Sequence, residues 1–231
     1  MKIIITSGGT SEAIDSVRDI TNKATGRLGQ VMAERFLEAG HHVTFVTTKH
    51  ALKPQPHDRL TLHLITNVTS LMETLEPLVK THDAIIHAMA VSDYTPVYMT
   101  DFETVSESND LSQFLTAHNA ETKISSSADY QVLFLKKTPK VISKIKKWNP
   151  AIHLIGFKLL VAVSQQELFE VARASLIKNK ADAIVANDLT EISADSHKAY
   201  LVTTSEAIQT ETKQGIAEMV LTFLKQIEDE K

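Results

Sequence analysis

The sequence predicts an α/β fold with a doubly wound, mostly parallel, Rossmann-like sheet and helices on both of its faces. Three observations support this prediction. Short β-branched apolar runs recur along the chain, most of them lack strict polar alternation, and helical patterns lie between them. Strands buried on both faces are typical of parallel sheets, and alternation of strand and helix builds such a sheet.

The expected elements follow from these runs and from the turn residues between them. Strands are expected at residues 3–6, 43–47, 60–65, 84–88, 153–157, 183–186 and 199–203. Helices are expected at residues 28–39, 68–80, 164–178 and 213–228, with a shorter lysine-fringed one near 141–147. Gly40 suits the end of the first helix, and Asn67 suits the start of the second. Ile216, Val220 and Leu224 lie on an apolar stripe of the last helix, which we expect to cover the sheet.

The chain is long enough to bury one large core. It has 231 residues, of which 43% are hydrophobic, and we expect a single domain over residues 1–231. Residues 98–122 break the rhythm because they are polar and acidic, and 106–110 is especially poor in core-forming side chains. We interpret 98–122 as a flap or insertion that covers a site or forms a dimer contact.

Composition excludes several classes of function. The net charge is -4 and the pI is about 6.2. The chain therefore lacks the excess of positive charge with which proteins bind the phosphates of a nucleic acid. It has no cysteine, which excludes disulfides, thiolate zinc sites and a thioester on the protein itself. We also expect no membrane partner and a cytoplasmic location, because no long apolar stretch or signal-like segment occurs.

A glycine loop follows the first expected strand. The loop consists of Ser7, Gly8, Gly9 and Thr10 and lies at the carboxyl end of that strand. Ligands bind at the carboxyl ends of the strands in doubly wound sheets. Glycines there let backbone N–H groups approach phosphate oxygens. A polar segment at residues 18–29 then enters the first helix near Gly26, and a helix N-terminus suits an anion.

This loop does not match a dinucleotide fingerprint. Sixteen residues separate Gly9 from Gly26, and the glycines do not follow the G-x-G-x-x-G pattern. No acidic residue follows the second strand to hold a ribose, which disfavours NAD and leaves an NADP-linked reductase open through Lys49. Tyr-x-x-x-Lys, the mark of short-chain reductases, does not occur. A non-catalytic protein that binds a nucleotide or metabolite is a second alternative.

Several motifs in order resemble the phosphopantothenate–cysteine ligase family, in its monofunctional bacterial form. They are residues 6–10, 15–18, 20–22 and 26–29, then 90–94, 123–126, 137–139 and 184–188, which together are spread over most of the chain. The resemblance implies a ligase of coenzyme A synthesis. In that reaction the carboxylate of phosphopantothenate attacks the α-phosphate of CTP and releases pyrophosphate. The amino group of L-cysteine then attacks the acyl-cytidylate and displaces CMP.

The resemblance also implies roles for particular residues. Lys123 would stabilise charge at the α-phosphate, and Asn22 would hold the acyl oxygen of the intermediate. Arg18, Asn22 and Gly26 would bind phosphopantothenate. Nucleotide contacts are implied for Gly8, Gly9, Thr10, Ala90, Asp93, Lys137 and Phe157.

The triphosphate implies Mg²⁺, although no motif in the chain points to ligands for it. Relatives are dimers with sites near the interface, so a homodimer is expected. One departure bears on the nucleotide. Lys158 follows Phe157 where family members often have an acidic residue, a pattern closer to relatives that use ATP. CTP remains the expectation, because bacterial members generally prefer it.

Overall fold

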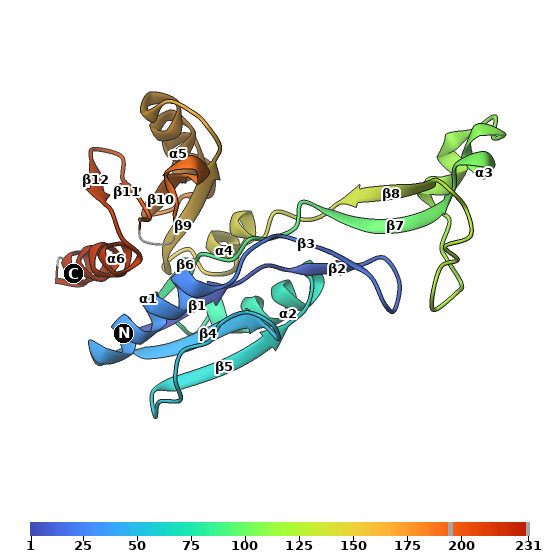
Figure 1. The fold of residues 1–231 in the computed structure, drawn as a ribbon. Coiled ribbons are helices and arrows are strands. Elements are labelled where there is room, and N and C mark those ends of the chain that lie inside the picture. Colours follow the sequence, from blue (N-terminus) through green and yellow to red (C-terminus); the bar gives the residue numbers. More distant parts are fainter. Residues whose placement is uncertain (194–195, 230–231) are drawn as a thin grey trace.

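The computed structural model describes residues 1–193 and 196–229, and a central sheet organises them (Figure 1). Its strand order is β12-β11-β10-β9-β6-β1-β4-β5. The strands are β1 (Lys2–Ser7), β4 (His42–Thr48), β5 (Leu60–Ile65), β6 (Ala84–His87), β9 (His153–Leu160), β10 (Ala183–Asp188), β11 (Ala199–Val202) and β12 (Ala207–Thr210). Neighbours from β5 to β10 pair in parallel, whereas β11 and β12 add antiparallel pairs at one edge. The prediction of a mostly parallel, doubly wound sheet is confirmed.

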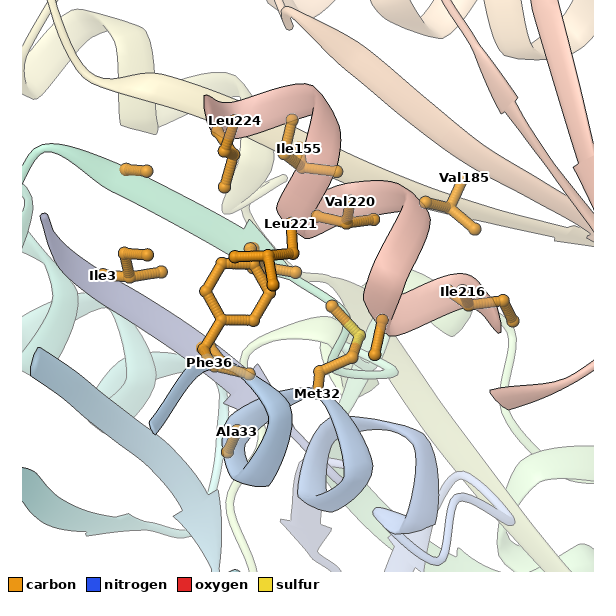
Figure 2. Packing of buried hydrophobic residues seen from close by; sticks show 14 of the residues in the cluster. Ile3, Met32, Ala33, Phe36, Ile155, Val185, Ile216, Val220, Leu221 and Leu224 are labelled. Carbon is orange, nitrogen blue, oxygen red and sulfur yellow. The ribbon is translucent and has the colours of Figure 1, made fainter. Parts of the chain in front are cut away.

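Helices cover both faces of the sheet. On one face, α1 (Arg27–Glu38) packs with α6 (Lys213–Asp229), and Figure 2 shows Met32 and Phe36 of α1 close to Leu221 of α6. The other face carries α2 (Val68–Val79), α4 (Ile142–Trp148) and α5 (Gln165–Asn179). Successive side chains of β1 alternate between these cores: Ile3 and Ile5 join the first, and Ile4 joins the second. This alternation explains why Ile3, Ile4 and Ile5 are apolar at successive positions.

The topology has a switch point at the carboxyl ends of β1 and β6. Strand β1 pairs with β4 on one side and with β6 on the other. After β1 the chain adds β4 and β5 on the first side, and it then returns to add β6 on the second side. Such a switch point is where open α/β sheets bind ligands. The glycine loop after β1 lies at this point.

A two-stranded arm projects from the sheet (Figure 1). Strands β7 (Tyr94–Asp101) and β8 (Gln131–Lys137) pair antiparallel, and α3 (Phe102–Ser106) and the 3₁₀ turn η1 (Leu111–Leu115) lie between them in the chain. Tyr98, Phe114 and Phe134 stack at the arm's end, with ring centroids 5.1 to 6.4 Å apart. These contacts form a small core of the arm's own.

Residues 98–122, which were expected to form a flap or insertion, lie within this arm. The insertion begins at Tyr94 and continues to Lys137, and residues 98–101 form the end of a strand rather than a loop. The polar composition of β7 and the register shift between Pro96 and Tyr98 leave this strand without a clear period-2 pattern. Pro96 adjoins a register shift in the pairing, where its missing N–H costs little.

The sequence pattern did not predict two further features of the structure. Strands β2 (Ser11–Ala13) and β3 (Asp19–Thr21) form a hairpin within the loop between β1 and α1, and each is too short to show a pattern. Strand β12 was not expected either. Within residues 1–193 and 196–229, none of the helices has the length and apolar character needed to cross a membrane.

Candidate active site

The glycine loop and the end of β6 are joined by backbone hydrogen bonds. Gly9 and Ala90 form a parallel bridge, the N–H of Ala90 donates to Gly8 O at 2.9 Å, and the N–H of Thr10 donates to Ala90 O at 3.1 Å. Gly8 has φ of +82°, in the left-handed region that favours glycine. The structure therefore brings together Gly8, Gly9, Thr10 and Ala90.

Buried hydroxyl groups fix this loop to the base of the arm. Thr10 is fully buried, and its Oγ1 accepts from the N–H of Ser92 at 2.8 Å and donates to Ser92 Oγ at 2.9 Å. The hydroxyl of Thr138, just after β8, donates to Ser92 O at 2.5 Å. Ser92 and Thr138 were not selected from the sequence, although both lie within motifs of the family pattern. Their small hydroxyl side chains next to buried strands were the available signal.

Asn22 lies over the loop. Its Nδ2 donates to Ala90 O at 3.2 Å, and the neighbouring Thr21 hydroxyl donates to Thr10 O at 3.0 Å. A Cβ on Gly9 would lie 3.1 Å from Asn22 O and 3.4 Å from Asn22 Cβ. Gly9 is thus the position that lets Asn22 approach so closely, while the Asn22 side chain stays exposed.

The N-terminus of α1 is held against the end of β1. The hydroxyl of Ser7 donates to Gly26 O at 3.1 Å, and a Cβ on Gly29 would lie only 2.2 Å from Ser7 Oγ. Gly26 caps the helix with φ of +82° and without any side-chain capping bond. The N–H of Arg27 donates to Thr25 Oγ1 at 3.3 Å, which leaves the next amide of the first turn, at Leu28, to an anion.

Arg18 and Asp15 clamp the segment that carries Lys123. Arg18 Nη2 lies 2.6 Å from Asp15 Oδ2 and also donates to Ile124 O at 3.1 Å, and Ile124 N donates to Asp15 Oδ2 at 3.2 Å. The guanidinium of Arg18, with backbone N–H donors, holds the pKa of the Asp15 carboxyl well below its usual range. Ser16 N adds a bond to Thr122 O at 2.9 Å. Arg18 is therefore engaged in structure, and its expected contact with phosphopantothenate must share the same guanidinium.

Lys123 and Asn22 lie at opposite ends of the β2–β3 hairpin. Lys123 is exposed beside the hairpin tip, whereas Asn22 follows the last residue of β3 at its base. The three residues of β3 span roughly 10 Å at 3.3 Å per residue. Among the described residues, no hydrogen bond or ion pair joins these two side chains, and their shared role stays a prediction.

The remaining expected nucleotide residues lie around the edge. Asp93 forms an ion pair with Lys140, and both side chains are more than half exposed. Lys137 ends β8 opposite Tyr94, so Lys140 rather than Lys137 neutralises Asp93. Phe157 is half-buried on β9 and packs against the core beneath α1 and α6.

A buried histidine stands behind the loop. His87 ends β6 and its Nδ1 lies 2.9 Å from Thr6 Oγ1. Burial lowers its pKa to about 4, so the ring is neutral at pH 7. Across residues 1–193 and 196–229, no group of three or more His, Cys, Asp or Glu side chains is arranged to hold a metal ion.

Comparisons with known proteins identify relatives. The model of the DNA/pantothenate metabolism flavoprotein C-terminal domain matches residues 1–111 and 98–227. The chain is 29% identical over 201 residues to the coenzyme A biosynthesis bifunctional protein CoaBC of Thermococcus kodakarensis, covering 87% of this chain and 44% of that protein. The chain spans about half the length of the curated relatives it matches.

Solved structures agree with this match. The crystal structure of the DNA/pantothenate metabolism flavoprotein from Streptococcus pneumoniae shares 55% identity and a TM-score of 0.95, over 98% of this chain and 99% of that one. A Cab2 mutant in complex with phosphopantothenate-cysteine shares the fold, with 17% identity and a TM-score of 0.74 over 99% of this chain and 86% of that one. The chain belongs to the family of DNA/pantothenate metabolism flavoprotein C-terminal domains.

Proposed function

We propose that this protein is a phosphopantothenate–cysteine ligase, which activates the phosphopantothenate carboxylate with CTP and then forms an amide with L-cysteine. The observation that carries the proposal is the Asn22 amide lying on the Ala90 carbonyl above a glycine loop. A glycine loop suits phosphates and an adjacent amide suits an acyl oxygen. Family membership and the relative bound to phosphopantothenate-cysteine support the same assignment.

The chemistry requires two anions to meet at one place. The carboxylate attacks the α-phosphorus, the bond to the bridging oxygen breaks, and pyrophosphate leaves. Fixed N–H dipoles of Gly8 and Gly9 and the N-terminus of α1 reduce the repulsion without needing to reorganise. In the second step the cysteine amine attacks the acyl carbon and CMP departs. The Asn22 amide orients the acyl oxygen in both steps and does not titrate.

Mg²⁺ would be carried by the triphosphate. The described residues offer no three-ligand cage, but Mg²⁺ commonly binds through one carboxylate, waters and substrate phosphates. Asp93 is the carboxylate that fits this role, because it is exposed next to the glycine loop and, among the described residues, forms its ion pair with the exposed Lys140. The ion would neutralise charge on the triphosphate. CTP is proposed over ATP, with Phe157 and Lys137 as further nucleotide contacts.

We propose that residues 1–231 act as one domain and that the protein works as a homodimer in the cytoplasm. The arm exposes large apolar side chains to solvent. Their solvent-exposed fractions are 51% for Phe102, 55% for Leu111, 61% for Leu115 and 70% for Tyr130. Clusters of this kind mark interaction surfaces. Lys123 is held at the hairpin tip, away from Asn22 of its own chain, so a partner's hairpin tip is the proposed source of the lysine at each glycine loop.

A single assay tests this function against the two alternatives. Purified protein is incubated with phosphopantothenate, Mg²⁺ and either CTP or ATP, with and without cysteine, while pyrophosphate, nucleoside monophosphate and the new amide are measured. The ligase releases equal amounts of pyrophosphate and CMP and forms the amide only with cysteine. Binding without pyrophosphate release would identify a sensor, and oxidation of NADPH with indifference to CTP would identify a reductase; either result refutes the ligase.

A further inference from the structure

A small cavity lies between the first turns of α1 and α6, beside the candidate site. Its volume is about 180 Å³, below the roughly 300–1,000 Å³ of pockets for drug-sized ligands. It is lined by Arg27 and Val31 of α1, by Ser196 and His197, and by Thr212, Lys213 and Gln214 at the start of α6. The two helices pack side by side, as Figure 2 shows at Met32 and Leu221.

The beginnings of two helices meet at this cavity. The first residue of α1, Arg27, and the first of α6, Lys213, both line it. Thr212 Oγ1 accepts from the N–H of Gly215 at 2.9 Å, which satisfies one amide of the first turn of α6 and leaves earlier ones free of an intrahelical acceptor. Both helices exceed three turns, and their positive dipole ends favour an anion between them.

His197 supplies a second, independent observation. It is 8% exposed, lines the cavity, and its Nδ1 is buried with no hydrogen-bond partner within the described part of the chain. Its Nε2 lies 3.5 Å from Asn187 Nδ2 on β10. Burial, followed by the charge of Lys213, lowers its pKa to about 4. A buried polar atom without a partner in a cationic setting is a group that a bound anion would satisfy.

The lining contains no carboxylate. Arg27, Lys213 and His197 surround the space with N–H donors, and no aspartate or glutamate is among its described lining residues. We propose that this cavity is an anion subsite that binds a phosphoryl group, held by Arg27, Lys213, His197 and the first amides of α6. Because Arg27 directly follows Gly26, the group is the pyrophosphate released from the nucleotide; this choice of source rests on the proposed function.

Binding to the full-length protein tests the subsite without any turnover. Inorganic pyrophosphate and inorganic phosphate are titrated separately, with calorimetry for the affinity and NMR of the histidine ring nitrogens for the location. We expect both anions to saturate one site and to shift the His197 ring signals, and the pKa of His197 to rise when the anion is bound. Lys213→Gln should weaken binding roughly ten- to a hundredfold, since it removes one charge-assisted hydrogen bond.

Lys225→Gln on the same helix is the matched control and should bind like the parent protein. Pyrophosphate binding much tighter than phosphate assigns the leaving group as the ligand, and equal binding assigns free phosphate. The inference is overturned if neither anion binds, or if both bind equally well to the Lys213→Gln and Arg27→Gln variants with the His197 signals unmoved. These readouts do not depend on ligase activity, so failure here and failure of the proposed function can be told apart.

Discussion

The side-chain amide of Asn22 donates a hydrogen bond to the carbonyl oxygen of Ala90, 3.2 Å away. This bond joins the end of β3 to the end of β6, across the glycine loop that follows β1. Residues far apart in the chain thereby share one edge of the sheet. The proposed chemistry depends on this edge, because it is where an acyl oxygen would meet an α-phosphate.

Asn22→Ala should lower turnover roughly a hundredfold, the usual cost of removing one oriented donor. The side chain is exposed, so the melting temperature should change little. Steady-state ligase kinetics and thermal denaturation on the same preparation check both points.

Lys123→Gln should instead slow pyrophosphate release in a single turnover. Mixed dimers of the Lys123→Gln and Asn22→Ala chains should regain ligase activity, because one of their two sites would then hold both native residues. Absence of rescue would place both residues in one chain's site.

Gly8→Ala should destabilise the fold more than Gly40→Ala. Both glycines have positive φ, at +82° and +92°, so each substitution carries a left-handed penalty of about 1–2 kcal/mol. A Cβ at residue 8 would also lie 2.7 Å from Ala51 Cβ, whereas nothing lies within 4 Å at residue 40. Overpacking adds roughly 1–3 kcal/mol at residue 8. Urea denaturation measures the difference, and equal losses would contradict the described packing.

Burial of His87 should make stability depend on pH. The unfolded histidine protonates near 6.5 and the folded one at about 4, so the unfolded state gains the proton first as pH falls. The free energy of unfolding should therefore drop between about pH 6.5 and 4, by about 3 kcal/mol from this residue. His87→Asn should make that drop smaller by this amount, while His197, whose pKa burial also lowers to about 4, keeps its own contribution. Identical curves for the parent and His87→Asn would show that the ring titrates normally.

Asp15 should stabilise the protein at neutral pH and less in acid. Its folded pKa is depressed by Arg18, so the contribution is complete above the ordinary carboxyl value of 3.8 and is lost as pH falls below it. Asp15→Asn removes this pH dependence and loosens residues 122–124. Amide hydrogen exchange of Ile124, which donates to Asp15, reports the local effect. Unchanged protection of Ile124 would argue against the clamp.

Arm substitutions test the dimer. Leu115→Glu should convert the protein to monomers, since a charge would enter the proposed apolar contact. Leu64→Glu on β5 is a suitable control, because Leu64 is 58% exposed, close to the 61% of Leu115. Sedimentation velocity gives the mass of each variant. A Leu115→Glu dimer with full ligase activity would remove the arm from the interface.

Periodicity predicted the sheet and its helices well, because their signals are long. The runs that became β1, β4 and β10 are rich in apolar residues without strict polar alternation, and they are buried at successive positions between two layers of helices. Helices α2 and α6 began within a residue of their expected starts. The paired strands of the arm were not predicted, since a two-stranded ribbon has little core and its apolar residues face each other only when paired.

The glycine loop, Ala90 and Asn22 could be selected from motifs, and the structure joins them. The β2–β3 hairpin could not be foreseen, because three-residue strands leave no periodic trace. It is this hairpin that separates Lys123 from Asn22 and commits Arg18 to Asp15. Contacts between distant loop segments, such as Ser92 with Thr138, depend on tertiary register that one sequence does not encode locally.

Exchange of labelled pyrophosphate into CTP tests the central claim most directly, because it reports the first chemical step alone. We predict that exchange requires phosphopantothenate and Mg²⁺, proceeds without cysteine, and falls sharply in the Lys123→Gln variant. Exchange that proceeds without phosphopantothenate, or none at all under conditions where both substrates bind, would contradict formation of an acyl-cytidylate at this site.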